Sequence, residues 1–344
     1  MVEKPKKINI AFNGFGRIGR NLVRKLISDT RYNIVAINAR TTVDVRAHLF
    51  KYDSVHGKYP GDVSYELDNL IIDGHTIPNF DRRTPAKLPW GELEVDFVVD
   101  STGKFTNKHD LEQHIEAGAK NVIVTSPAKG VDATLIFGVN ETSYKVQETN
   151  IISASSCTTT CLTPILKVLL KNFGIKHGTM TTVHSFTMGQ ALLDSSHPDL
   201  RRARSATMSI IPTSTGAAQN VGLVIPELEG KLDGLAIRVP VPNVSLLDLT
   251  IELETDTTIE DVLEVFEKEK KMHGILCVSY EPLVSVDYIG DSCSAIVDSL
   301  SSKMVNKRLL QLIAFYDNEY GYCCRVLDLL EYLAKKMPQS TSSK

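Results

Sequence analysis

The first 140 residues alternate short apolar runs with segments of helical character. The apolar runs are Ile8–Phe12, Ile34–Asn38, Phe97–Asp100, Val122–Thr125 and Leu135–Val139. Such alternation is typical of βαβ units, in which parallel strands form a sheet and the intervening helices cover it. We therefore predict a mainly parallel sheet in the first half of the chain.

The second half has a different pattern. Long β-rich runs fill Leu235–Glu252, and Thr257 followed by Glu260 fits a capping box that opens an amphipathic helix to about Lys271. Another helix is expected over roughly Arg325–Lys336, where apolar residues recur on one face. The simplest architecture is a parallel nucleotide-binding domain followed by an α+β domain.

Composition adds limits to this picture. The 344 residues are 42% hydrophobic and 23% charged, which suits two globular domains, and no apolar run approaches the roughly 18 residues of a membrane span. The net charge of -3 argues against nucleic-acid or membrane binding. The charged N-terminus does not resemble a signal peptide, so we expect a cytoplasmic protein whose six cysteines are free thiols. The polar tail Gln339–Lys344 is expected to be frayed.

A glycine-rich turn follows the first predicted strand. Gly14, Gly16 and Gly19 form the G-x-G-x-x-G pattern, which here opens a helix over Arg20–Ile27. The first glycine allows the tight turn, the second lets backbone N–H groups approach a pyrophosphate, and the third allows close helix packing. A glycine-rich turn without a ligand is the alternative, but the strand–turn–helix context favours a dinucleotide.

The end of the second strand bears on the choice of dinucleotide. NAD sites usually carry an acidic residue there, whereas this strand ends in Ala39 and Arg40. An arginine would attract the 2′-phosphate that an acidic residue would repel. NADP is therefore favoured, and the alternative is a surface arginine without a ligand.

A cysteine and a histidine are candidates for nucleophilic chemistry. Cys157 lies at the start of a predicted helix, where the positive end of the dipole should lower the thiol pKa toward the reactive range. It could equally be a buried apolar residue, and no second Cys/His pair completes a metal site with Cys161, so no metal is expected. His184 ends a β-like run and could act as the base, although a structural histidine is the plain alternative.

Two downstream segments suit phosphate binding. Asp199–Arg204 contains three arginines, and Pro212–Gly216 is a turn rich in threonine and serine. Arginine binds phosphate in bidentate fashion, and small hydroxyl residues expose backbone donors. A solvated basic face is the alternative.

Together these motifs resemble the glyceraldehyde-3-phosphate dehydrogenase family. The resemblance runs from about Ile8 to Leu333, with 27 residues between Cys157 and His184. Its anchors are Asn13–Arg20, Ser156–Thr159, Thr181–His184, Ser214–Ala218 and Tyr316–Tyr322.

The resemblance implies an α/β protein with a Rossmann-type parallel-sheet dinucleotide domain and an α+β catalytic domain whose sheet is mainly antiparallel. Residues 1–156 would form the dinucleotide-binding domain, to which 319–344 return, and 157–318 the catalytic domain. A homotetramer active in glycolysis or gluconeogenesis is also implied.

The resemblance further implies a two-stage reaction on a phosphorylated aldehyde. The Cys157 thiolate would add to the aldehyde, and His184 would take the hydroxyl proton as hydride leaves for the nicotinamide, giving a thioester. Inorganic phosphate would then release an acyl phosphate, while the Cys157 N–H and the His184 imidazole hold the oxyanion.

The same resemblance assigns binding roles to other residues. Those for the substrate and the attacking phosphate are Ser156, Thr158, Thr187, Arg202, Thr215, Gly216 and Arg238. Those for the cofactor are Gly14, Phe15, Gly16, Arg17, Ile18, Gly19, Ala39, Arg40, Arg83, Ser101, Thr102, Thr125, Ser195, Ser196, Asn318 and Tyr322. Asn318 would orient the nicotinamide carboxamide.

Several positions depart from the family pattern. Thr160 replaces the usual asparagine beside the catalytic helix start, and Gly189 replaces a threonine that often helps to hold the substrate phosphate. Ala39, Arg82 and the pair Ser195 and Ser196 all resemble NADP-using members. We therefore predict NADP use, with NAD also accepted.

Two other functions are weighed. His197–Arg202 resembles erythrose-4-phosphate dehydrogenases, although the Ser214–Ala218 turn resembles the phosphorylating enzymes. An inactive nucleotide-binding regulator is disfavoured because Cys157, His184 and Arg238 are all present.

Overall fold

The computed structural model describes residues 7–146, 148–269 and 272–337. The chain divides into two compact units. Unit 1 comprises Met1–Leu135, Glu141–Ser155 and Val326–Lys344, and unit 2 comprises Ile136–Asn140 and Ser156–Arg325. The predicted frayed tail, Gln339–Lys344, and the predicted helix end at Lys271 lie outside the described residues.

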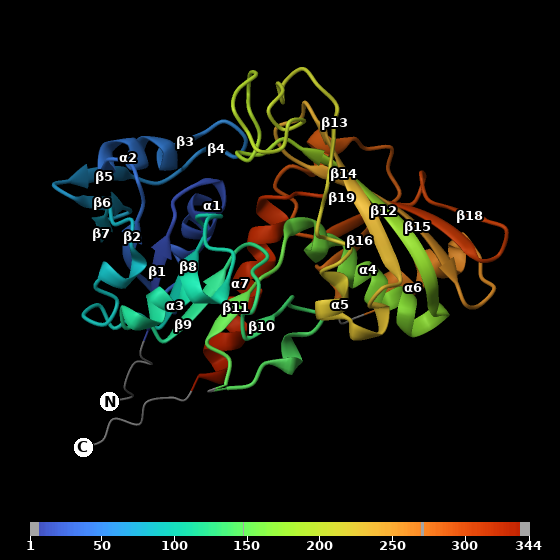
Figure 1. Cartoon of the computed structure of the whole chain (residues 1–344), viewed down its shortest axis with the longest axis horizontal. Helices are drawn as coiled ribbons and strands as arrows, with labels where there is room; N and C mark the ends of the chain where they lie inside the picture. Colours follow the sequence, from blue (N-terminus) through green and yellow to red (C-terminus); the bar gives the residue numbers. More distant parts are fainter. Residues whose placement is uncertain (1–6, 147, 270–271, 338–344) are drawn as a thin grey trace. The chain divides into compact units, whose positions relative to one another are not determined.

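Unit 1 is built on a nine-stranded sheet in the order β10-β11-β9-β8-β1-β2-β7-β6-β5 (Figure 1). The strands from β10 to β7 pair in parallel, and β5, β6 and β7 pair antiparallel at one edge. Its strands are β1 (Ile8–Asn13), β2 (Tyr32–Asn38), β5 (Val63–Glu66), β6 (Asn69–Ile72), β7 (His75–Phe80), β8 (Phe97–Asp100), β9 (Asn121–Val124), β10 (Ala133–Thr134) and β11 (Ile151–Ser153). A separate small hairpin joins β3 (Tyr52–Asp53) and β4 (Gly57–Lys58).

The helices of unit 1 connect these strands. They are α1 (Arg17–Leu26), α2 (Val43–Lys51) and α3 (Lys108–Glu116). The strands β8 and β9 are buried at every position, as expected for a parallel sheet covered on both faces. Because the strands from β10 to β7 run in the same direction, the polar residues at their carboxyl ends come together at one edge of the sheet.

Unit 2 contains an eight-stranded, mainly antiparallel sheet in the order β13-β14-β12-β15-β19-β17-β16, with β18 paired to β19. Its strands are β12 (Ile175–Ser185), β13 (Ile211–Thr213), β14 (Leu232–Val239), β15 (Ser245–Leu253), β16 (Leu276–Ser279), β17 (Ala295–Asp298), β18 (Lys303–Val305) and β19 (Leu309–Tyr316). Only β12–β14 and β16–β17 pair in parallel. The predicted fold class is confirmed.

Helices cover one face of this second sheet. They are α4 (Cys157–Phe173), α5 (Val221–Val224) and α6 (Ile259–Lys268), and α4 packs on β12, β15 and β17. Buried residues alternate strictly along β15, which is the pattern of a strand with one face in the core. The helix α7 (Tyr320–Lys336) begins in unit 2 and continues into unit 1. None of the helices in the described part of the chain has the length and apolar character of a membrane span.

Two predictions of local structure are wrong. Leu135–Val139 is not a strand: β10 ends at Thr134, and the run continues as a turn whose Ile136 and Val139 are buried in the core of unit 2. An apolar run indicates that its residues are buried, but it does not show that they form a strand. Here the buried residues lie in a turn. The capping box lies one residue later than predicted, between Thr258 and Asp261.

The cysteine prediction is also wrong for one pair. Cys277 and Cys293 form a disulfide, whereas Cys157, Cys161, Cys323 and Cys324 are free. Cys277 lies on β16 and Cys293 just before the parallel strand β17, so strand pairing brings two positions 16 residues apart together. No regular cysteine spacing could indicate this.

Candidate functional site

The glycine turn joins β1 to α1 in unit 1. Gly14 has φ +101°, and a Cβ there would lie 2.7 Å from the backbone of Ser101 and Thr102. A Cβ on Gly19 would lie 2.5 Å from the carbonyl oxygen of Gly14, so the helix packs directly against the turn. By contrast, a Cβ on Gly16 would meet nothing within 4 Å. The turn is thus tight on the protein side and open at Gly16, which fits the close approach of a pyrophosphate.

Two side chains of the turn are held by the protein itself. Phe15 is buried and stacks on Phe50 with ring centroids 6.0 Å apart. Arg17 donates to Asp53 at 2.5 Å. Burial opposes ionisation of Asp53, but N–H groups of His56 and Val55 together with Arg17 lower its pKa to about 2. Phe15 and Arg17 therefore fix the shape of the turn, and its backbone is the group available to a ligand.

The predicted residues Ser101, Thr102 and Thr125 lie at the carboxyl edge of the same sheet. The Ser101 hydroxyl donates to the Gly14 carbonyl at 2.9 Å, and the Thr102 hydroxyl donates to Asp100 at 2.7 Å. The Thr125 hydroxyl donates to the Asp100 carbonyl at 3.2 Å. These hydroxyls bind the ends of the strands to one another.

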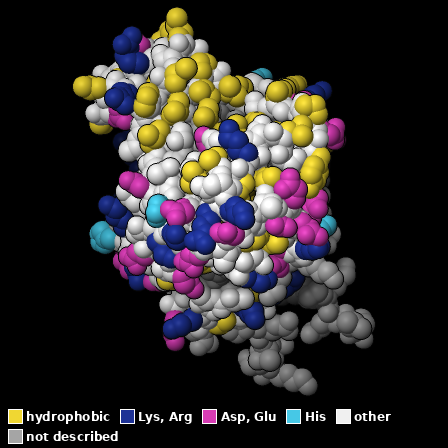
Figure 2. Space-filling model, turned by 90° about the vertical axis from the view of Figure 1, so that its right-hand side faces the viewer, with side chains coloured by type: hydrophobic (Ala, Val, Ile, Leu, Met, Phe, Trp, Pro, Cys, Tyr) yellow, Lys and Arg dark blue, Asp and Glu magenta, His cyan; other side chains and the backbone are white. Residues whose placement is uncertain are grey.

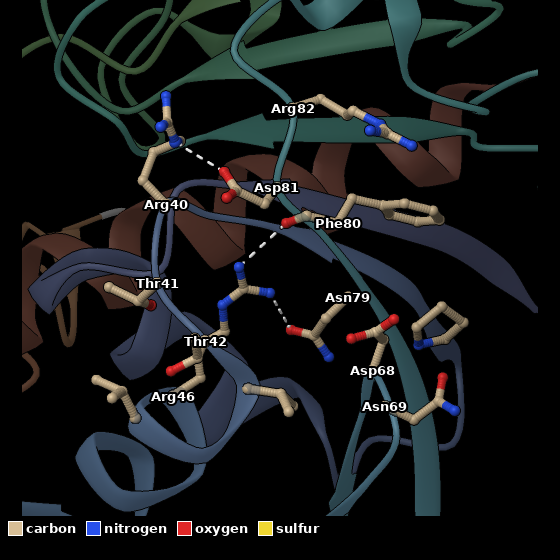
Figure 3. A pocket seen from close by; sticks show the side chains of 13 residues that line it. Arg40, Thr41, Thr42, Arg46, Asp68, Asn69, Asn79, Phe80, Asp81 and Arg82 are labelled. Atoms are coloured by element: carbon tan, nitrogen blue, oxygen red, sulfur yellow. Dashed lines mark hydrogen bonds and ion pairs between the residues drawn. The ribbon is translucent and has the colours of Figure 1, made fainter.

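A pocket of about 900 Å³ opens beside the end of β2 (Figure 3). Arg40 Nε lies 2.7 Å from the Asp81 carboxylate, and both side chains are largely exposed. The buried Arg46 donates to Asn79 at 2.7 Å and to the carbonyl of Ala39 at 2.6 Å. Arg82 also lines the pocket, whereas the predicted Arg83 is exposed and is not among the lining residues. The pocket therefore combines three arginines with two aspartates, Asp68 and Asp81.

In unit 2, Cys157 and His184 lie side by side. Cys157 is the first residue of α4, and the N-cap Ser156 accepts a hydrogen bond from the Thr159 N–H at 3.1 Å. His184 stands near the end of β12, and its Nε2 lies 3.4 Å from Cys157 Sγ. The sheet thus brings a histidine to the thiol at the positive end of a helix.

Arg238 completes this group. It lies on β14 in register with His184, and its Nη1 is 2.9 Å from His184 Nδ1 and 3.0 Å from the Ser185 carbonyl. His184 Nδ1 is also 2.7 Å from that carbonyl. The two contacts at Nδ1 require opposite tautomers, because arginine can only donate. We assign the proton to Nδ1, because the contact of Nδ1 with the Ser185 carbonyl is shorter than its contact with Arg238. Arg238 Nη1 then donates to the same Ser185 carbonyl instead of to the imidazole.

This tautomer leaves the Nε2 lone pair facing the thiol. Burial, followed by the charge of Arg238, lowers the pKa of His184 to about 3. The imidazole is therefore neutral at physiological pH and able to accept a proton.

The predicted lowering of the Cys157 pKa is wrong for this state of the site. Burial raises the pKa of the thiol, while Arg238 and the N–H groups at the start of α4 act in the opposite direction. Desolvation of the thiolate exceeds these favourable contributions. The resting pair is thus a thiol beside a neutral imidazole.

Tyr316 begins the last anchor of the resemblance, which assigns it no role, and it packs beside His184. Its buried hydroxyl lies 2.9 Å from Thr158 Oγ1 and 2.8 Å from Thr182 Oγ1, linking α4 to β12. Its ring meets that of His184 edge-on at 6.0 Å. A tyrosine in a β-rich run carries no sequence signal of this role.

Asn318 follows β19 and is buried. Its Oδ1 accepts hydrogen bonds from Ser185 and Ser245, both at 2.9 Å. With the oxygen held in this way, the amide NH2 is the group that Asn318 can offer to a ligand. Tyr322, four residues on, is buried in α7.

The phosphate candidates form a second polar group in unit 2. Arg202 Nε donates to Thr213 Oγ1 at 2.9 Å and lies 3.5 Å from Asp199. Thr213 lies on β13, which pairs with the strand that carries Arg238. Burial lowers the pKa of Arg238 and the charge of Arg202 adds to this, although Cys157 and Tyr316 oppose it. Arg238 Nε is buried and has no hydrogen-bond partner among the described residues, as expected for a group that awaits an anion.

The remaining candidates lie on loops. Thr187, Ser195 and Ser196 are exposed in the segment between β12 and β13, and Gly189 lies 3.7 Å from the Thr187 hydroxyl, measured from an ideal Cβ. Thr215 Oγ1 accepts from the Ala217 N–H at 3.2 Å in the turn that contains Gly216. Thr160 is buried in α4, and its hydroxyl has no partner among the described residues.

Comparisons with known proteins agree with this architecture. The model described as "Glyceraldehyde 3-phosphate dehydrogenase, NAD binding domain" matches residues 8–108, and "Glyceraldehyde 3-phosphate dehydrogenase, C-terminal domain" matches residues 156–318. The chain is 50% identical over 333 residues to glyceraldehyde-3-phosphate dehydrogenase 2 of Bacillus subtilis (strain 168), with 96% of this chain and 98% of the relative covered. It is 49% identical over 331 residues to glyceraldehyde-3-phosphate dehydrogenase of Geobacillus stearothermophilus, with 96% and 99% covered.

The chain belongs to the glyceraldehyde-3-phosphate dehydrogenase family. The first matching model covers the glycine turn and the pocket beside β2, and it is described as an NAD-binding domain. Unit 1 therefore accommodates a nicotinamide dinucleotide. The second model spans Cys157, His184, Arg202 and Arg238, so all the polar groups assembled in unit 2 fall within the C-terminal domain of the glyceraldehyde-3-phosphate dehydrogenase family.

Proposed function

We propose that the chain catalyses the reversible phosphorylating oxidation of glyceraldehyde 3-phosphate to 1,3-bisphosphoglycerate, with a nicotinamide dinucleotide as hydride acceptor. The observation that carries the proposal is the 3.4 Å contact between Cys157 Sγ and the unprotonated Nε2 of His184. A neutral imidazole beside a thiol at a helix N-terminus can generate the nucleophile as the substrate binds.

The first stage uses Cys157, His184 and Arg238. His184 Nε2 accepts the thiol proton, and the sulfur adds to the aldehyde carbon. The imidazolium returns that proton to the new alkoxide oxygen, which gives a thiohemiacetal and leaves Nε2 unprotonated again. His184 then takes the hydroxyl proton while hydride leaves that carbon, which makes a thioester. When bound, the dinucleotide supplies the hydride acceptor. The N–H of Cys157 and the imidazole are suited to hold the oxygen that carries the developing charge.

The second stage requires two anion sites. In the proposal, Thr187 and Arg238 hold the substrate phosphate, and the residues that hold the attacking phosphate are Ser156, Thr158, Arg202, Thr215 and Gly216. The unpartnered Nε of Arg238 and the hydrogen-bonded guanidinium of Arg202 support these assignments. Phosphate oxygen attacks the thioester carbon, the acyl phosphate leaves, and the sulfur recovers its proton from His184.

The direct test is the initial rate of aldehyde oxidation with and without inorganic phosphate. Reduced dinucleotide should form at a sustained rate only when phosphate is present, because the thioester needs a second nucleophile. Equal sustained rates with and without phosphate would contradict the phosphorylating mechanism. A preference for erythrose 4-phosphate would contradict the proposal that glyceraldehyde 3-phosphate is the substrate.

We further propose that NADP is preferred and that NAD is also accepted. Ala39 places no carboxylate at the end of β2, and Arg40 and Arg82 line the adjacent pocket. Asp81 pairs with Arg40 in the absence of a ligand, so a 2′-phosphate would have to replace that carboxylate. The cationic character of Arg40 and Arg82 supports this exchange.

Two variants test the cofactor preference. Arg40→Ala should raise KM for NADP about 10-fold or more, as expected for the loss of a hydrogen bond between charged groups, and leave KM for NAD nearly unchanged. Ala39→Asp should shift the kcat/KM ratio toward NAD. Arg308→Ala is a matched control, since Arg308 is an equally exposed arginine paired with Asp256 in unit 2. If Arg40→Ala altered both cofactors alike, the preference would not reside at this arginine.

A homotetramer is the proposed assembly. The segment 186–210 carries large apolar side chains that are exposed in the single chain. These residues are Met188, Leu192, Leu193, Leu200, Met208 and Ile210. In the view of Figure 2, hydrophobic side chains gather at the top. Several large exposed apolar side chains in one segment are typical of a protein interface. Light scattering after gel filtration should give four chains, and a monomer at micromolar concentration would contradict the assembly. A cytoplasmic location stays a prediction from the N-terminal sequence and the cysteine content.

A further inference from the structure

A row of buried polar residues lies beneath the glycine turn of unit 1. Asn38, Asn13 and Asp100 end the neighbouring strands β2, β1 and β8, and strand pairing places them in register. None of the three side chains is more than slightly exposed, and Asp100 is completely buried. A buried carboxylate is costly unless it is fully hydrogen-bonded.

Asp100 receives donors from three sides. Its Oδ2 accepts from Asn13 Nδ2 at 2.6 Å and lies 3.3 Å from His114 Nε2. Its Oδ1 accepts from the Thr102 hydroxyl at 2.7 Å and from the Thr102 N–H at 3.1 Å. The carboxylate is therefore solvated by neutral donors, one of which is an imidazole on α3.

The tautomer of His114 is determined by Trp90. The indole Nε1–H can only donate, and it lies 3.0 Å from His114 Nδ1. Nδ1 must therefore be unprotonated, so the ring is neutral and carries its proton on Nε2. That proton is the one directed at Asp100. Asn13 Nδ2 lies 3.3 Å from the same Nε2, but with this tautomer it is a neighbour and not a donor to the ring.

The row continues to the edge of the pocket beside β2. Asn38 Nδ2 donates to Asn13 Oδ1 at 2.7 Å and to the Arg82 carbonyl at 3.0 Å, while Asn38 Oδ1 accepts from the Arg82 N–H at 2.8 Å. One continuous set of hydrogen bonds thus joins Trp90 to Asn13, which directly precedes Gly14, to Thr102 and to the backbone of Arg82.

We propose that His114 is a positioning residue for the dinucleotide site: through its Nε2–H it holds Asp100, and through Asp100 it fixes Asn13 and Thr102 on either side of the glycine turn. This inference rests on the proposed binding of a dinucleotide to unit 1. It also makes Trp90 a reporter, since Trp90 is the only tryptophan in the chain and its N–H is bonded directly to His114.

Two substitutions distinguish the hydrogen bond made by Nε2 of His114 from the one made by Nδ1. His114→Gln places an amide near the Nε2 position and can still donate to Asp100. His114→Asn is shorter, so it can still accept from Trp90 but cannot reach Asp100. Both remove the buried ring, and a purely structural role would therefore affect them alike.

The experiment measures oxidised dinucleotide affinity by calorimetry on the folded full chain, together with Trp90 emission excited at about 295 nm, where tryptophan absorbs selectively. His114→Asn should weaken binding about 10-fold, which corresponds to about 1.4 kcal/mol, and His114→Gln should remain within about 3-fold of wild type. At saturating dinucleotide, kcat of His114→Asn should be close to the wild-type value, since the effect is on binding. Binding should also shift the Trp90 emission of the wild-type chain.

Several results would overturn the inference. Equal affinities for the Asn and Gln variants would show that the Nε2–H is not used. If both variants fail to fold, the emission of the wild-type chain still tests the inference. No change in Trp90 emission at saturating dinucleotide would contradict a link between Trp90 and the dinucleotide site. Failure of the wild-type chain to bind any dinucleotide is a separate result, which refutes the proposed function instead.

Discussion

The glycine turn offers a test in which two neighbouring, chemically identical substitutions should act in opposite ways. Gly14→Ala places a Cβ at φ +101° and 2.7 Å from backbone atoms of Ser101 and Thr102. The positive φ costs about 1–3 kcal/mol in a residue with a side chain, and overpacking against atoms that cannot rotate away adds about 1–3 kcal/mol. We expect the free energy of unfolding to fall by about 2–6 kcal/mol.

Gly16→Ala should leave the fold intact. Gly16 has φ -79° and ψ -156°, a conformation open to alanine, and its Cβ would meet nothing within 4 Å. Alanine stabilises by restricting the unfolded chain, by about 0.4–1 kcal/mol, but it is a poorer N-cap than glycine. These effects oppose each other, so stability should change by no more than about 1 kcal/mol. The new methyl group would occupy the open side of the turn, and dinucleotide affinity should fall at least about 10-fold.

The assay combines urea unfolding with dinucleotide binding. Trp90 emission follows the unfolding of unit 1 without dinucleotide, because no other tryptophan contributes. An unchanged denaturant slope would show that the same structure unfolds in each variant. Wild-type affinity in Gly16→Ala would refute the pyrophosphate-binding role of the turn. Wild-type stability in Gly14→Ala would refute the packing argument.

Other predictions concern the catalytic unit. Cys157→Ser should abolish turnover while dinucleotide binding persists, and His184→Asn should lower kcat by about 10²–10⁴-fold, as steady-state rates would show. Because burial, followed by Arg238, lowers the pKa of His184 to about 3, its imidazole binds a proton in the unfolded chain below about pH 6.5 but not in the folded chain. This contribution to stability is complete above pH 6.5 and is lost as pH falls, by about 2 kcal/mol at pH 5. Between pH 7.5 and pH 5, the free energy of unfolding measured in urea should therefore fall less for His184→Asn than for the wild-type chain. Equal falls would contradict the low pKa. Since burial raises the Cys157 pKa, its alkylation by iodoacetamide should still be accelerating at about pH 9, and a plateau near neutral pH would argue for a preformed thiolate. Thiol titration of the unfolded, unreduced chain should give four free cysteines, and six would show that Cys277 and Cys293 are not joined.

The sequence by itself determined the class of both units. Alternating apolar runs identified β1, β2, β8 and β9, because a strand buried on both faces must be apolar along its length. The glycine spacing identified the turn, since only glycine fits a positive φ against the neighbouring backbone at Gly14. The same local logic failed for Leu135–Val139, where Ile136 and Val139 belong to unit 2 and are buried in its core without forming a strand. The predicted domain boundaries and the individual site roles stay predictions.

Only the tertiary structure decided how polar groups pair. Nothing local to His184 distinguishes it from the other histidines, but β12 and α4 bring its Nε2 to Cys157. The neutral state of His184 and the raised pKa of Cys157 follow from burial, which depends on the whole unit rather than on helix position alone. Likewise, Trp90, His114 and Asp100 come from three separate segments and meet only because packing brings helix α3 and the segment that carries Trp90 to the end of β8. Sequence pattern encodes local geometry and burial, whereas hydrogen-bond partners distant in the chain are determined by packing.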